Sequence, residues 1–206
     1  DKPIKLDDTV LKFLSVKGWY SQIKKKIIDL TKPFFINNLV FSTRVEVKQV
    51  VKVDDLNSFP WTKEFADSEK SLFVRIAYED NKEIRIPSSP VDNDMEADFV
   101  NFLTKAKDVI SFIKNIPHIV GLKITYYDSR ERKWRKFYPD FIVKTKNGYY
   151  LVETKGREEI QVLDKNIAAQ KWCEAVSIAT KREWKYLYLR EGSWNGKENL
   201  KECDEE

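Results

Sequence analysis

The stretch "YPDFIVKTKNGYYLVETKG", from Tyr138 to Gly156, predicts two apolar strands joined by a turn at Lys146-Asn147-Gly148. Each strand carries charge beside apolar residues. Asp140 follows a proline at the head of the first strand, and Glu153 and Lys155 lie two residues apart near the end of the second. An unpaired charge in such company is costly, so these three side chains need an explanation other than solvation.

The geometry of a hairpin brings these residues together. Side chains at i and i+2 of a strand share a face, so Glu153 and Lys155 point the same way and Thr154 points to the opposite side. The turn folds the second strand beside the first, which places Asp140 at the same end of the sheet. Pro139 has no N–H and disturbs strand pairing just before Asp140.

Two carboxylates and a lysine suit phosphodiester hydrolysis. This reaction needs a divalent cation, an activated water and stabilisation of the developing negative charge. Asp140 and Glu153 offer the hard oxygen ligands that Mg²⁺ takes, one or two at a time. The backbone carbonyl of Thr154 can complete the shell, and Lys155 can orient the water or meet the charge. The alternative is an exposed ion pair at a sheet edge, worth about 0–1 kcal/mol.

The spacing Pro-Asp, twelve residues, Glu-Thr-Lys resembles the PD-(D/E)xK nuclease superfamily. Glu-x-Lys alone is uninformative because it recurs at Glu46, Glu131 and Glu183, whereas Pro139-Asp140 is the one Pro-Asp in the chain. With "KNIAAQKWCEA" downstream, the stretch looks like the C-terminal endonuclease domain of the restriction (Res) subunit of type III restriction enzymes.

This resemblance implies several further properties. The fold would be restriction-endonuclease-like α/β, with an αβββαβ core and a central mixed sheet flanked by helices. The activity would be that of a Mg²⁺-dependent deoxyribonuclease, with Mn²⁺ able to substitute. The partners would be double-stranded DNA, a methyltransferase (modification) subunit, and an upstream ATP-dependent helicase or translocase region that this chain lacks.

The resemblance also implies site residues beyond the hairpin. Relatives often add an acid from the first core helix, a role we carry over to Glu96, with Asp98 as the alternative. Some use a Gln or Lys of the second helix, here Gln170 or Lys171. The basic stretch "SRERKWRKF" is either a solvated turn or a DNA-facing tip that uses Trp134, Arg135 and Lys136, and Lys144 is a similar candidate.

Periodicity predicts the elements around the motif. Over residues 1–90 we expect an accessory α+β module, and over 91–206 the endonuclease domain, with an extended linker at Pro87-Ser88-Ser89-Pro90 as the boundary. The expected elements are a helix over 8–30 or two helices broken at Gly18, a strand over 41–53, a hairpin over 71–87, a helix over 92–114, strands over 120–128, 135–144 and 149–156, a helix over 163–180, a strand over 183–191, and a polar, frayed tail.

Composition excludes several classes. The chain of 206 residues has a net charge of +4, which permits contact with a polyanion without demanding it. It holds two distant cysteines and one histidine, so zinc and histidine chemistry are not expected. No phosphate-binding loop occurs, and no membrane segment or signal peptide is visible. A reducing, cytoplasmic location follows, and the single methionine at position 95 suggests a piece of a longer protein.

Two rival functions remain open from the sequence. One is a DNA-binding or docking module that keeps a relic nuclease fold without turnover. The other is a different nuclease of the same superfamily, such as a junction resolvase or a repair nuclease.

Overall fold

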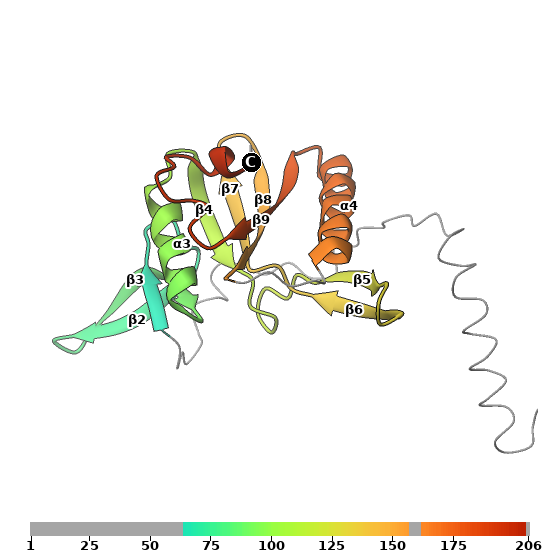
Figure 1. The fold of residues 1–206 in the computed structure, drawn as a ribbon. Helices are drawn as coiled ribbons and strands as arrows, with labels where there is room; N and C mark the ends of the chain where they lie inside the picture. Colours follow the sequence, from blue (N-terminus) through green and yellow to red (C-terminus); the bar gives the residue numbers. More distant parts are fainter. Residues whose placement is uncertain (1–63, 157–161, 205–206) are drawn as a thin grey trace, which may run out of the picture. The chain divides into compact units, whose positions relative to one another are not determined.

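The structure is a computed structural model that describes residues 64–156 and 162–204, all within one compact unit, Thr43–Glu206 (Figure 1). The helix expected over residues 8–30 and the strand over 41–53 lie outside the described residues. No helix of the described part is both long and apolar enough to cross a membrane.

A four-stranded mixed sheet forms the centre, in the order β4-β7-β8-β9. Strand β7 (Phe141–Thr145) pairs antiparallel with both β4 (Val109–Lys114) and β8 (Tyr149–Lys155). Strand β9 (Trp184–Arg190) pairs parallel to β8. The crossover between β8 and β9 is helix α4 (Val162–Thr180). The turn predicted between β7 and β8 is confirmed, with Thr145 N–H donating to the Gly148 carbonyl at 2.8 Å.

Helices cover both faces of this sheet (Figure 1). Strand β8 is buried on both sides and alternates between two apolar clusters. Tyr150 and Val152 belong to the cluster that includes helix α3 (Asp94–Lys105), and Leu151 to the one that includes α4. The expected restriction-endonuclease-like fold, a central mixed sheet flanked by helices, is therefore confirmed.

The first core strand differs from the prediction. The helix expected over residues 92–114 ends at Lys105, and Val109–Lys114 forms β4. Ala106 leaves the helical conformation, with φ −59° and ψ 126°. A short apolar run such as "VISFIK" fits the period of a helix as well as that of a strand, and only its pairing with β7 makes it a strand.

The region expected as the first two core strands is largely an insertion. Strands β5 (Ile124–Asp128) and β6 (Lys133–Phe137) pair only with each other, as a two-stranded sheet. The strand predicted over 135–144 is thus split at Tyr138-Pro139-Asp140, and β4 takes the place of the strand predicted over 120–128. The αβββαβ order is kept as α3-β4-β7-β8-α4-β9.

The linker predicted at residues 87–90 is wrong. These residues end strand β3 (Lys82–Val91), which pairs first with β2 (Val74–Glu79) and then with β1 (Glu64–Asp67). Ser88 and Ser89 are fully buried. Proline lacks an N–H but keeps its carbonyl, and the hydrogen bonds at this point need no proline N–H. Ser88 N–H donates to the Phe73 carbonyl, and the Pro87 carbonyl accepts from Ser68 N–H.

The hairpin predicted before that point is confirmed. Asp80 and Asn81 connect β2 to β3 with φ values of 48° and 63°, the left-handed pair that a tight two-residue hairpin turn requires. The division into modules at residue 90 stays a prediction, because residues 1–63 of the first module are outside the described part.

The C-terminal tail is packed, contrary to the prediction of fraying. Trp194, Leu200 and Cys203 are buried in the α3 cluster, the last two within a short 3-10 helix, Leu200–Cys203. Asp108 accepts hydrogen bonds from the backbone N–H groups of Leu200 and Lys201 at 2.8 and 3.0 Å. Three apolar side chains among polar residues were enough to dock this segment.

Candidate active site

The motif residues meet where β7 begins and β8 ends. Phe141 pairs with Val152, so the next step of the antiparallel register sets Asp140 beside Glu153. The Lys155 ammonium lies 3.2 Å from Glu153 Oε1, consistent with the shared face predicted for these residues. The electrostatic field at Asp140 includes contributions from Glu96 and Lys155, and that at Glu153 includes Asp140. The structure thus brings all four predicted catalytic residues into one cluster.

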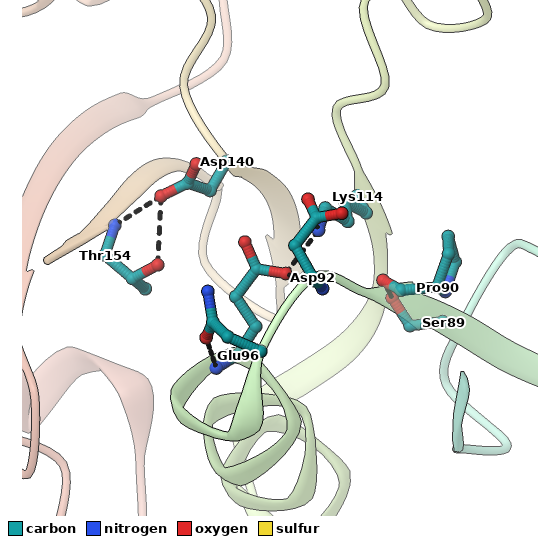
Figure 2. Close-up of polar contacts among 8 residues, drawn as sticks. Ser89, Pro90, Asp92, Glu96, Lys114, Asp140 and Thr154 are labelled. Atoms are coloured by element: carbon teal, nitrogen blue, oxygen red, sulfur yellow. Dashed lines mark hydrogen bonds and ion pairs between the residues drawn. The ribbon is translucent and has the colours of Figure 1, made fainter. Parts of the chain in front are cut away.

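Thr154 fixes the Asp140 carboxylate (Figure 2). Its backbone N–H and its hydroxyl both donate to Asp140 Oδ2, at 2.7 and 2.9 Å. The Asp140 carbonyl in turn accepts from Asn115 N–H at 2.7 Å. Asp140 stands one residue before β7, so its side chain replaces a ladder partner for Thr154. Sequence reasoning assigned Thr154 a metal-binding carbonyl and missed this role in orienting the acid.

Glu153 is a buried carboxylate with too few hydrogen-bond partners for its two oxygens. It is 5 % exposed, and its Oε2 has no hydrogen-bond partner among the described residues. Burial, followed by the negative charge of Asp140, raises the pKa of Glu153 to about 7, against the opposing effect of Lys155 and Lys165. A buried acceptor of this kind is rare in folded proteins and points to a bound ion or water.

Asp140 is in the same situation to a lesser degree. Burial raises its pKa above the ordinary value, the two Thr154 hydrogen bonds lower it, and the negative charge of Glu96 raises it again. A nearby cation would act in the opposite direction on these acids, because an opposite charge favours the ionised form.

Glu96 is held from three sides at the start of α3 (Figure 2). It is 6 % exposed, so the alternative of a solvated acid does not apply, while Asp98 is exposed. Glu96 Oε2 accepts from Asp92 N–H at 2.7 Å and pairs with the ammonium of Lys114. Glu96 N–H donates at 2.9 Å to Oδ1 of Asn93, the residue that caps the N-terminus of the helix.

Lys114 is the main residue that sequence reasoning missed. It is 5 % exposed and also pairs with Asp92 Oδ2 at 2.6 Å. The prediction of a helix over 92–114 concealed it. Read as a strand, "VISFIK" places Lys114 on the same face as the buried Phe112, which is the signal that was available. Lys165 was also missed; it lies in the first turns of α4, and its charge acts on Glu153.

The predicted DNA-binding residues do not cluster with the carboxylates. Trp134, Arg135 and Lys136 lie on β6, and Arg135 pairs with Asp128 Oδ2 at 2.9 Å and with Glu131. Lys144 is exposed near the end of β7 that is remote from Asp140. Gln170 and Lys171 are both exposed on α4. Their contact with DNA stays a prediction.

The donor set fits Mg²⁺. Among the described residues, no three side chains of His, Cys, Asp and Glu are close enough to hold a metal ion by themselves. Mg²⁺ does not need three, because it keeps several waters and takes one or two carboxylates. Two adjacent carboxylates with raised pKa values and one oxygen without a partner are what such an ion would satisfy.

Comparison with known proteins supports an endonuclease. Residues 106–191 match the family model described as TnsA-like endonuclease N terminal, which shows a nuclease fold over this segment. The match runs from just before β4 to just after β9 and contains Lys114, Asp140, Glu153 and Lys155, while Glu96 precedes it. Searches of curated proteins and of solved structures each returned no match.

Proposed function

We propose that this protein is a Mg²⁺-dependent endonuclease that hydrolyses phosphodiester bonds of DNA. The observation that carries the proposal is the Glu153 carboxylate, buried beside Asp140 with Oε2 unpartnered among the described residues, in a segment that matches an endonuclease family. In a purely structural ion pair, both oxygens of a buried carboxylate would have hydrogen-bond or charge partners. A carboxylate that binds a cation lacks such a partner when the ion is absent.

Each side chain has a distinct role in this proposal. Asp140 and Glu153 would hold the ion, assisted by the Thr154 carbonyl and water. When bound, Mg²⁺ neutralises charge on the reacting phosphate and acidifies coordinated water. Lys155, whose ammonium lies 3.2 Å from Glu153 Oε1, would orient the attacking water or stabilise the charge that develops. Glu96 adds a third negative charge from α3.

Lys114 and Thr154 are positioning residues. Lys114 and the Asp92 N–H both engage Glu96 Oε2, which fixes that carboxylate. Thr154 fixes Asp140 through the same kind of double contact with Oδ2. Both acids are thereby held before any ion arrives, which lowers the entropic cost of binding it.

A finer assignment rests on the sequence resemblance alone. In it, the chain is the nuclease part of a type III restriction translocase subunit, works with a methyltransferase subunit and a motor region, and is cytoplasmic. The matched family model has a different description, so it supports the nuclease without supporting this system. Helicase motifs in a sequence directly upstream of Asp1 would support the type III assignment.

Plasmid cleavage tests the proposal. We expect the full chain to cut DNA with Mg²⁺ or Mn²⁺, to stop in EDTA, and to lose cleavage by at least a hundredfold in Glu153→Ala. Lys105→Ala, an exposed lysine at the far end of α3 from Glu96, is the control for charge and handling. DNA binding without cleavage under any of these conditions would favour the relic module. Faster cleavage of branched than of linear DNA would favour a resolvase.

A further inference from the structure

The hairpin β5–β6, which ends three residues before Asp140, concentrates positive charge. Residues 122–137 contain six basic and two acidic side chains, a formal +4 that equals the net charge of the whole chain. The basic residues are Lys123, Arg130, Arg132, Lys133, Arg135 and Lys136, and the acidic ones are Asp128 and Glu131. The other residues of the chain therefore have a formal net charge of zero, and the positive excess of the whole chain lies in this insertion.

The two faces of the hairpin differ in chemistry. On the inner face, Tyr126 and Phe137 are buried in the α4 cluster, and Arg135 is bound to Asp128 and Glu131. Glu131 also pairs with Lys133. The two acids are thus used by two of the six cations. The other four, Lys123, Arg130, Arg132 and Lys136, have no ion-pair partner within the described residues.

The outer face combines an aromatic pair with a lysine. Cross-strand pairing sets Trp134 opposite Tyr127 and Lys136 opposite Thr125. The two rings meet edge to face, 5.5 Å between centroids, and Trp134 is 56 % exposed. Successive residues of a strand point to opposite faces, so Lys136 points outward whereas its neighbour Arg135 points inward. An exposed indole with flanking cations suits a surface that meets sugar and phosphate.

The two ends of the hairpin are hydrogen-bonded to one side chain, next to Asp140 in the sequence. The buried Asn115 donates to the Pro139 carbonyl at 2.8 Å and to the Leu122 carbonyl at 2.7 Å, and accepts from Leu122 N–H at 3.0 Å. One side chain therefore joins both ends of the insertion, directly before Asp140. Toward the tip, Ser129 donates its N–H and hydroxyl to Asp164 of α4, at 2.9 and 2.7 Å.

We propose that the outer face of β5–β6, through Lys136 and Trp134, binds the sugar-phosphate backbone of double-stranded DNA and sets the distance from that contact to the cut. This inference rests on the proposed function. Four residue steps separate Lys136 from Asp140, at most about 14 Å between Cα atoms. That span corresponds to about four base-pair steps of the duplex, so the gripped phosphate lies a few nucleotides from the scissile one.

Fluorescence anisotropy with a labelled 30-base-pair duplex, in EDTA and with the full chain, tests this surface. We expect Lys136→Ala with Trp134→Ala to weaken binding about tenfold, and Lys136→Ala alone to reduce the slope of log K against log salt by about one. Lys105→Ala removes the same charge from α3 and should bind as the wild type does. Lys136 is exposed, so Lys136→Ala should leave the melting temperature unchanged. Trp134→Ala removes the ring contact with Tyr127 and should lower it by a few degrees.

The outcomes separate this inference from the proposed function. Weakened binding by the double variant of a protein that never cleaves DNA would support the hairpin surface and reject the nuclease. A double variant that binds and cuts like the wild type would reject the hairpin surface and leave the nuclease intact. A wild-type chain without measurable DNA binding, or a larger effect of the double variant on an RNA duplex of the same sequence, would overturn the proposal.

Discussion

Glu153 and Asp140 illustrate how burial sets the chemistry of single carboxylates. Each is drawn from water into an apolar sheet, and each sees another acid nearby. Burial is the largest cause of both raised pKa values, ahead of any charge. Raised pKa values mean that protons compete more strongly with a divalent cation for these carboxylates than for exposed ones.

The pH dependence of stability tests this account of Glu153. A folded-state pKa of about 7, raised above the usual value of about 4.5, means that the folded protein binds more protons than the unfolded chain between these values. Stability is therefore lost as pH rises through this window. In EDTA at pH 8 we expect Glu153→Gln to be more stable than the wild type by roughly 2–3 kcal/mol, with the difference vanishing near pH 4.5.

Thermal melts at pH 5 and pH 8, with and without Mg²⁺, give the measurement. Mg²⁺ should raise the melting temperature of the wild type at pH 8 and leave that of Glu153→Gln unchanged. A Glu153→Gln protein that is less stable than the wild type at pH 8 would contradict the account, because it would mean that the native carboxylate is already compensated.

Lys114 provides a second test at the scale of single residues. Its side chain and that of Glu96 are 6 % and 8 % exposed, so Lys114→Met leaves a buried acid without its cation. We expect a loss of about 3–5 kcal/mol in urea unfolding. Much of it should return in the double variant Lys114→Met, Glu96→Gln, which buries no charge at this point.

The control is a pair of the same chemistry at the surface. Lys107 pairs with Glu198, and both side chains are 66 % exposed. Lys107→Met should cost less than about 1 kcal/mol. Equal losses in the two lysine variants would show that burial does not govern the Lys114 pair.

At the scale of elements, the segment that holds β1–β3 makes direct contacts with α3 and with the central sheet. Lys70 donates to the Ala106 carbonyl at the end of α3 at 2.6 Å, and burial lowers its pKa. Residues 70–72 also cover β4, the edge of the central sheet: Phe112 N–H donates to the Lys70 carbonyl and Leu72 N–H to the Phe112 carbonyl, both at 2.9 Å. An uncovered edge strand promotes aggregation.

Truncation tests this integration. A fragment of residues 91–206 keeps the whole PD-(D/E)xK motif but loses the Lys70 contact with the C-terminal end of α3 and the segment that covers β4. We expect it to aggregate or to melt without cooperativity, whereas a fragment of residues 64–206 should retain a single transition. Solubility and circular dichroism melts of the two fragments provide the comparison. A soluble, cooperatively folded 91–206 fragment would show that residue 90 is a true domain boundary.

At the scale of the whole molecule, the described residues contain one cluster of candidate catalytic carboxylates. Under the proposed function one such cluster would cut one strand, so two copies would have to cooperate to break a duplex. We expect supercoiled plasmid to become open circles first, with linear DNA rising later and more steeply with protein concentration. Gel time courses over a tenfold range of protein concentration measure this order. Linear product without an open-circular intermediate would indicate a preassembled pair of chains.

The sequence alone determined the features that depend on neighbours along the chain. Alternation and turn chemistry predicted β7, β8 and the turn between them, helix α4 and strand β9, and they placed Asp140, Glu153 and Lys155 at one end of the sheet. These features follow from periods of 2 and 3.6 residues and from a hairpin, which are local properties.

Only the tertiary structure decided the features that depend on distant partners. "VISFIK" is a strand because it pairs with β7. Residues 87–90 are part of a strand, buried from Ser88 onward, because β1 and β2 lie beside them, and the tail packs because α3 offers an apolar surface. Lys114 joins the site, and Glu153 holds its proton to about pH 7, because segments far apart in sequence remove both from water. Burial and long-range pairing are properties of the assembled fold, and no window of sequence contains them.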